Sequence, residues 1–598
     1  MKKLYFLVIV IFAVVSVKGQ VINFPDGTFK SKLVYYTDIA KNLEGVYFKV
    51  DANNNGQIEV SEALQVSELD LTQGVGYFIG NFAGLEYFTN LKTFKTVSPS
   101  LSTFDISALT NLTTLSFTNS NLTNLIFDTS TSLLEDLDIT QNLFQSLDVS
   151  GMESLRILKC GKNSLLSLNI SGCINLTTLE CSENELTVLN LTDCIKLANL
   201  NCAKNNLTAL DVTPNINIEE LLCEENQIGS LDVSMLENLK SLQCHTNGMT
   251  VLNMDGLENI EKLNCSTNVL SSINVGGLVH LKKLECFDNQ LSEISVGELI
   301  DLEILNCNNN LITALDVEGK TKLKNLKFSN CPISTITLTG LDTIMQIECN
   351  NTALGEIDIS GLTTLLALTC TNSNISTLNL SGATSSIGVY CSDNQIESLN
   401  LNGLSNLKYF NCDHNLLTSL NLTGLTNISS LICTENLFTT LDLTDLHKLN
   451  TLWINYNPFL ESVFMKNGAP YNISTSGSVV LYGCTNLQYI CADENKIAGL
   501  TQKVAELENN CVVNSYCSFT PGGTFYTING NNTFDSNNNG CDASDENLPN
   551  LKFNITNGAQ TGSIIPNQTG EYSIPVQAGT HTITPVFENP SYYTISTT

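Results

Sequence analysis

Basic residues are scarce in this chain. Of its 598 residues, 28 are Lys or Arg and 59 are Asp or Glu, which gives a formal charge of -31 at pH 7. Such a surface repels phosphate backbones, so we expect no nucleic-acid partner. Most of these carboxylates are interpreted as a solvated face, which is the usual role of acidic runs.

Catalytic groups are also few. The five histidines are scattered, and no two share a position in the repeat described below, so neither a metal cluster nor a catalytic triad is indicated. The sequence contains no evident G-x-S-x-G elbow or Walker loop. Paired carboxylates such as Glu219 and Glu220 lie at outward repeat positions, where an acidic face is the simpler interpretation. The sequence therefore predicts that the protein is not an enzyme.

Long apolar runs are limited to the start of the chain. The run from Leu4 to Val17 follows two lysines and precedes Gly19, a pattern typical of a secretory signal. It is shorter than the about 20 residues that a membrane span needs. We predict a signal peptide over residues 1–20 and no membrane span in the mature chain. The expected product is a secreted monomer, with cell-surface association as an alternative.

A repeat of 21 residues occupies most of the chain. One column of this repeat holds cysteine, two residues after a leucine and three residues before an asparagine, as in Leu158, Cys160 and Asn163. Phe328 takes the place of one cysteine, and Ile454 ends the column. The column cysteines are Cys160, Cys181, Cys202, Cys223, Cys244, Cys265, Cys286, Cys307, Cys349, Cys370, Cys391, Cys412 and Cys433.

The repeat has a direct physical reading. Alternate side chains of a strand face opposite sides, so Leu158 and Cys160 are expected to point inward and Lys159 outward. Coils stacked about 4.8 Å apart would merge the leucine columns into one core, stabilised by contacts between neighbours. Asn163 and its equivalents are interpreted as structural, because a buried amide must bond backbone groups of its own coil and the next.

The residues Leu-x-Cys-x-x-Asn-x-Leu resemble the leucine-rich repeat, and the 21-residue period resembles the bacterial, internalin-like variety. The resemblance implies a mainly β solenoid over residues 66–496, built from short parallel strands. It implies a second short strand in each coil at pairs such as Leu189 and Leu191. It also implies a function in protein–protein interaction or adhesion.

The cysteines admit two interpretations. Secreted proteins rich in cysteine usually form disulfides, but side chains stacked in register keep their Cβ atoms farther apart than the about 3.8 Å that a bridge prefers. We therefore predict buried, inert thiols that act as small hydrophobes, rather than a metal ladder or a redox centre. Outside the column, a bridge from Cys491 to Cys511 is expected where the solenoid ends.

Residues 21–65 are predicted to cap the first coil. They contain FKSKLVYY, an expected short helix, and DANNNGQIEVSE, which resembles the EF-hand loop pattern D-x-N-x-N-G-x-I-x-x-x-E. The resemblance implies a structural Ca²⁺ site, and an Asn-rich turn without metal is the alternative. The implied ligands are Asp51, Asn53, Asn55, the carbonyl of Gln57, Glu59 and Glu62.

The other flank is predicted to hold a cap helix at residues 497–516 and an Ig-like β-sandwich at residues 517–598. Ile497, Leu500 and Val504 recur at helical spacing, and short alternating strands with Gly, Pro and Asn turns follow. We expect either release of the chain or a reading frame truncated at Thr598. The segment NNTFDSNNNGCDASDENLPNLKFNI resembles calcium-bearing B-type or carboxypeptidase-regulatory-type sandwiches, with a loop that joins strands. The implied ligands are Asp535, Asn537, Asn539, Asp542 and Glu546.

Outward positions of the repeat are free of core constraints and available for recognition. Most hold small polar or charged residues, but the last coils place larger residues there, namely Tyr390, Tyr409, Ile432, Trp453 and Tyr456. Exposed Tyr and Trp anchor protein interfaces or stack on sugars. An extracellular protein and a glycan are both candidate ligands. A passive spacer, in which these aromatics only stiffen the last coils, is the third interpretation.

Overall fold

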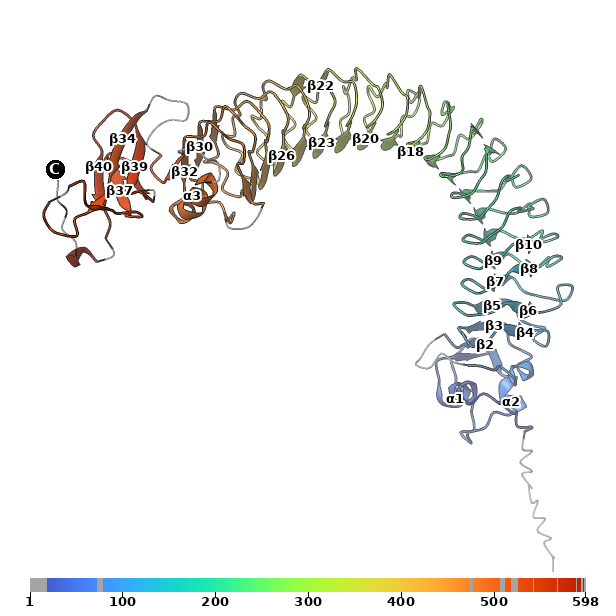
Figure 1. Ribbon diagram of the computed structural model, residues 1–598. Helices are drawn as coiled ribbons and strands as arrows, with labels where there is room; N and C mark the ends of the chain where they lie inside the picture. Colours follow the sequence, from blue (N-terminus) through green and yellow to red (C-terminus); the bar gives the residue numbers. More distant parts are fainter. Residues whose placement is uncertain are drawn as a thin grey trace, which may run out of the picture. The chain divides into compact units, whose positions relative to one another are not determined.

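The computed structural model describes residues 19–72, 79–473, 477–505, 511–517, 525–540, 542–566, 568–587, 589–592 and 595. Most of the predicted signal peptide at 1–20 therefore lies outside the described residues. The chain divides into two compact units, Met1–Gly277 and Leu278–Thr598, and together they hold about 21 turns of a parallel β-solenoid (Figure 1). No helix among the described residues is long and apolar enough to cross a bilayer.

The first unit begins with two helices. α1 (Gly27–Tyr35) starts after Asp26, whose carboxylate accepts two backbone N–H groups of the first turn, both at 2.9 Å. α2 (Val60–Ala63) follows the Asn-rich loop, and β1 (Ala40–Asn42) pairs antiparallel with β2 (Val66–Asp70). The helix expected from FKSKLVYY is confirmed. Its role as part of an EF-hand-like cap stays a prediction.

Each coil contributes one short strand just before its cysteine position, which we call the A strand. In the first unit the A strands pair in parallel and in register, so that Leu158, Leu179 and Leu200 lie side by side. They are β2, β3 (Thr93–Thr96), β5 (Thr114–Phe117), β7 (Asp136–Asp138), β9 (Ile157–Lys159), β11 (Thr178–Glu180), β12 (Asn199–Asn201), β13 (Glu220–Leu222), β15 (Ser241–Gln243) and β17 (Lys262–Asn264).

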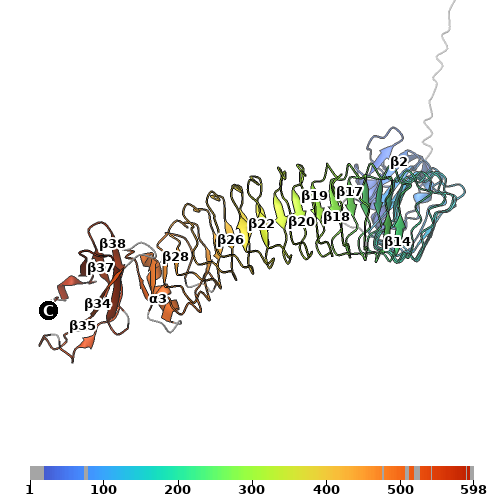
Figure 2. The same cartoon turned by 90° about the horizontal axis from the view of Figure 1, so that it is seen from above.

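The A strands of the second unit follow the same rule, and Figure 2 shows them as a row of parallel arrows. They are β18 (Lys283–Glu285), β19 (Ile304–Asn306), β20 (Asn325–Lys327), β21 (Gln346–Glu348), β23 (Ala367–Thr369), β25 (Gly388–Tyr390), β26 (Tyr409–Asn411), β27 (Ser430–Ile432), β29 (Thr451–Trp453) and β31 (Val479–Val480).

A second strand, the B strand, forms in some coils only. The pairs are β4 (Thr103–Asp105) with β6 (Asn124–Ile126), β8 (Ser146–Asp148) with β10 (Ser167–Asn169), β14 (Ser230–Asp232) with β16 (Val251–Asn253), and β22 (Glu356–Asp358) with β24 (Thr377–Asn379). β28 (Thr440–Asp442), β30 (Ser462–Met465) and β32 (Tyr489–Ala492) form a longer row. Leu189 and Leu191 are buried but lie in no strand, because burial of their side chains does not require ladder hydrogen bonds.

The core matches the expected columns. Leu158 and Cys160 are fully buried, and Lys159 between them points outward to pair with Glu180. The buried asparagines differ from the expectation in one respect. Each amide bonds its own coil and the preceding one, not the next one: Asn184 Nδ2 donates at 3.0 Å to the carbonyls of Cys160 and Cys181.

Cysteines outside the main column replace asparagine as hydrogen-bond donors. Cys331 stands in the asparagine column, and its Sγ donates to the carbonyl of Cys307 at 3.2 Å, 24 residues back, as Asn184 does to Cys160. Cys484 donates to the carbonyl of Ile454 at 3.1 Å. Cysteine was not expected in this role, because the sequence alone does not reveal which backbone group each thiol meets.

The last coils continue into antiparallel strands. α3 (Ile497–Ala505) confirms the start of the expected helix, and residues 506–510 lie outside the described residues. The end of the predicted cap helix is wrong, because β33 (Val512–Asn514) is a strand that pairs in parallel with β32 and antiparallel with β38. A strand forms there because the adjacent β32 offers an open edge with backbone hydrogen-bonding groups.

The remaining strands and short helices complete the described structure. They are β34 (Tyr526–Asn531), β35 (Thr533–Phe534), β36 (Glu546–Asn547), β37 (Phe553–Thr556), β38 (Thr561–Ile564), β39 (Glu571–Val576), β40 (Thr582–Pro585), η1 (Leu85–Tyr87), η2 (Glu494–Lys496) and η3 (Pro590–Tyr592). β34 pairs with β39, and β37 lies between β38 and β40. Their shared core includes Tyr516, Phe553 and Ile574. The Ig-like sandwich assignment and the domain limits stay predictions.

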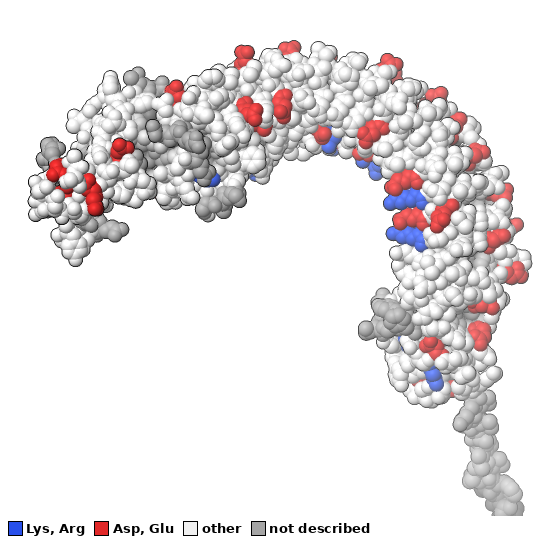
Figure 3. All heavy atoms as spheres, viewed as in Figure 1, with Lys and Arg blue, Asp and Glu red and all other residues white. Residues whose placement is uncertain are grey.

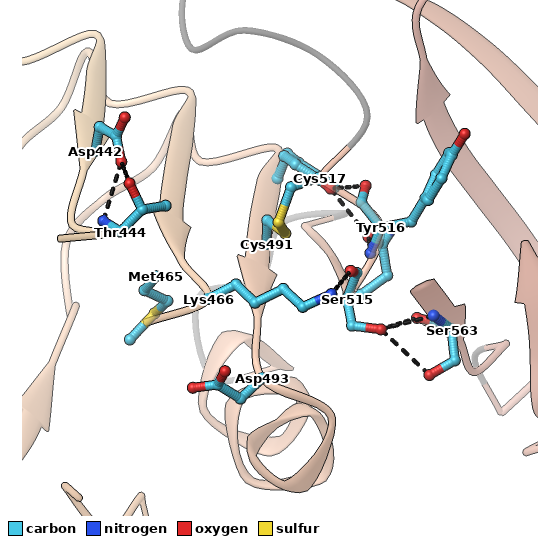
Figure 4. The surroundings of a disulfide bond; sticks show 12 residues. Asp442, Thr444, Met465, Lys466, Cys491, Asp493, Ser515, Tyr516, Cys517 and Ser563 are labelled. Carbon is cyan, nitrogen blue, oxygen red and sulfur yellow. Dashed lines mark hydrogen bonds between the residues drawn. A yellow bond between two sulfur atoms is a disulfide. The ribbon is translucent and has the colours of Figure 1, made fainter. Parts of the chain in front are cut away.

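The expected bridge between Cys491 and Cys511 is wrong. Cys491 forms a disulfide with Cys517, across a Cα–Cα distance of 5.6 Å, and Cys511 is a half-buried thiol (Figure 4). In the register of β32 and β33, Cys491 lies opposite Asn514, three residues beyond Cys511. The side chain of Asn514 then accepts the N–H of Tyr516 at 2.9 Å, and this turn brings Cys517 back to Cys491.

Candidate functional site

The last A strands place large side chains in one outward column. Tyr390, Asn411, Ile432 and Trp453 are successive partners in the parallel register of β25, β26, β27 and β29. Three of the five predicted patch residues therefore share a column, interrupted by Asn411. The parallel pairing holds these side chains at the spacing of neighbouring strands.

Tyr409 stands beside this column, at the first residue of β26. Its register partner on β25 is Gly388, and the ring of Tyr390 folds over that glycine, so that a Cβ at Gly388 would lie 2.9 Å from Tyr390 Cε2. Tyr390 is half-buried as a result. Burial raises the pKa of Tyr390, and the nearby Tyr409 adds to the rise. Tyr409 itself remains 45% exposed.

Trp453 and Tyr456 lie at the far end of the patch. Trp453 is 40% exposed, and its Nε1 donates to the carbonyl of Gly477 at 2.8 Å, which fixes the indole while leaving part of it open. Tyr456 is 47% exposed, and its ring meets that of Tyr482 edge-to-face at 5.5 Å. The two aromatic rings form a fixed pair at the surface.

Tyr482 is a member of this patch that the 21-residue period does not predict. Its side chain is 61% exposed. The register pairs Trp453 with Val480, so this coil advances by 480 − 453 = 27 residues instead of 21. A longer coil shifts every later residue off the sequence lattice, and only the strand pairing reveals that Tyr482 lies beside Tyr456.

Carboxylates border the aromatic residues, and they share one histidine. His414 Nε2 lies 3.0 Å from Glu435 Oε2, and its Nδ1 lies 3.5 Å from Asp413 Oδ2 and 3.9 Å from Asp393 Oδ1. Burial raises the pKa of Asp413, an effect that His414 opposes and Asp393 reinforces. The other carboxylate oxygen of Asp413, Oδ1, is enclosed and accepts no hydrogen bond among the described residues.

Asp393, His414, Glu435 and Tyr456 belong to a further column, two residues after the cysteine position, which we call the rim column. Its members have a left-handed backbone, with φ between 50° and 55° at these four residues. Earlier in the second unit, the rim column carries a ladder of side-chain hydrogen bonds of 2.5 to 2.8 Å. In each bond an asparagine donates to the side chain of the column member one coil earlier. Its members are Asp288, Asn309, Asn330, Asn351 and Asn372.

The N-terminal loop was the first predicted metal site, and its polar groups converge. Asp51 is buried, and its two oxygens accept the N–H groups of Asn55 at 3.0 Å and Gly56 at 3.2 Å. Asn53 Oδ1 accepts the N–H of Asn55 at 3.0 Å. Gly56 has φ +76°, as the sharp turn of such a loop requires. The side-chain oxygen of Gln57 faces away and accepts from Lys30 at 2.7 Å.

Two carboxyl groups meet at the other side of this loop. A hydrogen bond joins the side chains of Glu59 and Glu62. Burial is the main cause that raises the pKa of Glu62, and this hydrogen bond adds to the rise. The same hydrogen bond lowers the pKa of Glu59. Glu59 also accepts from Asn53 at 3.0 Å and from Asn55 at 2.8 Å. Glu59 and Glu62 thus supply carboxyl oxygens of the kind that Ca²⁺ binds.

The second predicted metal loop has the same local geometry. Asp535 accepts the N–H groups of Asn539 at 3.2 Å and Gly540 at 2.9 Å, and Asn537 Oδ1 accepts from Asn539 at 3.0 Å. The loop joins β35 to β36, which pair antiparallel, so the expectation of a strand-connecting loop is confirmed. Residue 541 lies outside the described residues.

Three acidic residues follow in the second loop. Asp542 Oδ1 accepts the N–H and the hydroxyl of Ser544, and Glu546 lies opposite Phe534 in the hairpin. Asp545, which the sequence did not single out, has one enclosed oxygen that accepts no hydrogen bond in the described structure. In the described part of the chain, no three His, Cys, Asp or Glu side chains converge as a ready metal site, so both loops depend on amide and carbonyl oxygens as well.

Comparisons with known proteins support the fold. No family model and no curated protein matches the chain. Among solved structures, YopM from Yersinia enterocolitica WA-314 is similar at 20% identity and a TM-score of 0.56, over 72% of this chain and 92% of that one. The functional domain of InlJ from Listeria monocytogenes, which includes a cysteine ladder, is similar at 20% identity and a TM-score of 0.42, over 92% and 99% of the two chains. With the 21-residue spacing and the stacked parallel strands, the likeness to YopM shows a leucine-rich-repeat solenoid.

Proposed function

We propose that this is a secreted binding protein, monomeric and without enzymatic activity, that recognises an extracellular protein through the A strands of its last coils. The observation that carries the proposal is the aromatic patch, defined as Tyr390, Tyr409, Ile432, Trp453, Tyr456 and Tyr482. Trp453, Tyr456 and Tyr409 are each at least 40% exposed. Exposed tyrosine and tryptophan side chains of this kind are the residues most enriched at interface centres.

The strands that carry the patch are rigid. The backbone of each is hydrogen-bonded on both sides, and Trp453 is fixed by its bond to Gly477. A partner would therefore meet an ordered backbone and a fixed indole, which lowers the entropy cost of binding. The leucine-rich-repeat fold supports the same function, since outward positions of a repeat array vary without disturbing the core.

We also propose that Ca²⁺ stiffens the flanks, at the loop of Asp51, Asn53, Asn55 and Glu62 and at the loop of Asp535, Asn537 and Asn539. In this role the metal is structural and takes no part in binding the partner. The shared hydrogen-bond geometry of the two loops supports the assignment.

Arrays of extracellular proteins and of glycans, probed in parallel with the intact protein, would test the proposed partner class. We expect a protein ligand whose binding weakens about tenfold or more in Trp453→Ala, because loss of an interface anchor has an effect of this size. Tyr35→Ala serves as a control, since Tyr35 is exposed on α1 in the other unit. A polysaccharide ligand lost in Trp453→Ala would establish the glycan alternative instead. No ligand on either array would favour the passive spacer.

A further inference from the structure

The aromatic patch and the carboxylates beside it point to a specific partner chemistry. Building on the proposed function, we infer that the partner presents a basic, arginine-bearing extended segment to this face. Its guanidinium group would bind between the aromatic rings and the carboxylates of Asp393, Asp413 and Glu435. These three residues, together with Trp453 and Tyr456, are called the acidic–aromatic face.

The repeat itself provides the comparison that supports this inference. Carboxylates at the same rim position in the first unit have a lysine on the adjacent coil: Lys162 lies 3.7 Å from Glu183, and Lys204 lies 3.7 Å from Glu225. The outward position before the cysteine is balanced in the same way by Lys327 and Glu348, at 3.1 Å. Figure 3 shows several Lys and Arg side chains directly beside Asp or Glu.

The acidic–aromatic face lacks that balance in the described structure. Asp393, Asp413 and Glu435 have His414 as their ion-pair partner, and His414 carries a charge only when it is protonated. The lysines of these coils lie elsewhere: Lys408 precedes β26, at the opposite end of the strand from Asp413. Three carboxylates in neighbouring coils thus place a negative potential beside exposed aromatic rings.

The chemistry of the face selects a cation with planar geometry. A guanidinium group binds a carboxylate through two parallel N–H groups and stacks on the faces of Trp and Tyr rings. A neutral glycan would leave the carboxylates uncompensated, and an acidic glycan would be repelled. An extended basic segment therefore fits better than a sugar chain.

A metal ion is a poorer occupant of this face. His414 stands between the carboxylates, at 3.0 to 3.9 Å from each of them, and separates their oxygens. Ca²⁺ requires six to eight oxygens at about 2.4 Å. The described residues contain no such convergent set here.

A fluorescence titration would test the inference directly, because Trp453 is the single tryptophan of the chain. The intact protein would be titrated with an acetylated (Arg-Ser)₅ peptide and with the same peptide carrying citrulline in place of arginine. Citrulline keeps the shape of arginine and removes its charge. We expect a saturable change in Trp453 fluorescence with the arginine peptide, and we expect salt to weaken this binding. The citrulline peptide should bind at least about tenfold more weakly than the arginine peptide.

Variants would locate the binding. Asp413→Asn and Glu435→Gln keep the shape of the side chains, so each should fold and should weaken binding of the arginine peptide by about tenfold. Glu183→Gln, at the same rim position but paired with Lys162, should have no effect.

The inference is overturned if the arginine peptide produces no saturable change, or if the citrulline peptide binds equally well. It is also overturned if Glu183→Gln weakens binding as much as Asp413→Asn does. A protein ligand that depends on Trp453 but ignores these carboxylate variants would leave the proposed function standing and remove the basic segment. A polysaccharide ligand would overturn both.

Discussion

Each buried asparagine bonds several backbone groups at once. Asn226 Nδ2 donates to the carbonyls of Cys202 at 3.0 Å and Cys223 at 3.2 Å, and its Oδ1 accepts the N–H of Leu207 at 3.0 Å. Both ends of this amide reach the preceding coil. At the scale of single residues, this column is what satisfies the polar backbone in the turns.

Removal of one such amide should open its coil locally. Asn226→Ala leaves the N–H of Leu207 and the carbonyl of Cys202 buried without that partner, and each such loss costs about 1–3 kcal/mol. We expect the free energy of opening at Leu207 to fall by about 3 kcal/mol, measured by native-state hydrogen exchange. Asn217→Ala is the control, because Asn217 makes an exposed bond to Ile195. Unchanged protection of Leu207 would contradict this role for Asn226.

At the scale of elements, the A strands followed from the sequence wherever the lattice was intact. The inward Leu158 and Cys160 and the outward Lys159 were correctly predicted, since a parallel ladder leaves alternate side chains little choice. The B strands were predicted for all coils but form in some, because Leu189 and Leu191 can be buried without a ladder.

The patch was predicted only in part. Its A-strand residues follow from the 21-residue period. Tyr482 lies beyond a coil that is 27 residues long, and the 21-residue period does not predict this length. The carboxylates of Asp393, Asp413 and Glu435 were not singled out, because their importance depends on which coils lack a lysine partner. Cys517 was not predicted as the disulfide partner of Cys491. Its position depends on a turn in which the side chain of Asn514 accepts the N–H of Tyr516, and the repeat pattern does not show this turn.

The two Asn-rich loops make a prediction of their own. Excess Ca²⁺ at about 100 times its dissociation constant should stabilise a flank by about 2.7 kcal/mol. Thermal unfolding with calcium and with chelator should show this difference, and Asp51→Ala and Asp535→Ala should each abolish one part of it. Asp38→Ala, at an exposed position outside the loop, should retain the full response. Identical melting curves with calcium and chelator would leave the metal-free Asn-rich turn as the interpretation.

At the scale of the whole molecule, the cysteine column runs through the cores of both units. Cys181 and Cys202 in the first unit and Cys391 and Cys412 in the second are fully buried. Burial raises the pKa of Cys181 to about 12 and also raises that of Cys202 well above the ordinary value of 9.0. Protonated, buried thiols agree with the expectation of small hydrophobic side chains without reactivity.

This column should make the protein sensitive to alkali. Because the folded pKa values are raised, the thiols favour the folded state below pH 9 and lose that effect as pH rises toward about 12. We expect the midpoint of urea unfolding to fall steadily above pH 9. Cys181→Ala and Cys202→Ala, combined, should flatten the slope. Rapid alkylation of these two thiols in the folded protein at pH 8 would contradict their burial.

The backward reach of the asparagine column gives the array a direction. The cysteine carbonyl of a coil accepts one bond from its own coil, as Cys433 does from Asn436, and gains a second donor from the residue 24 positions later, here Asn457. During synthesis, therefore, the newest coil is always incomplete, and we expect the folded front to follow the ribosome one coil behind the latest one made. A series of bonds made in this way must end at a final donor. Among the described residues, Cys484 makes the last bond of this series, to the carbonyl of Ile454, from within a longer coil.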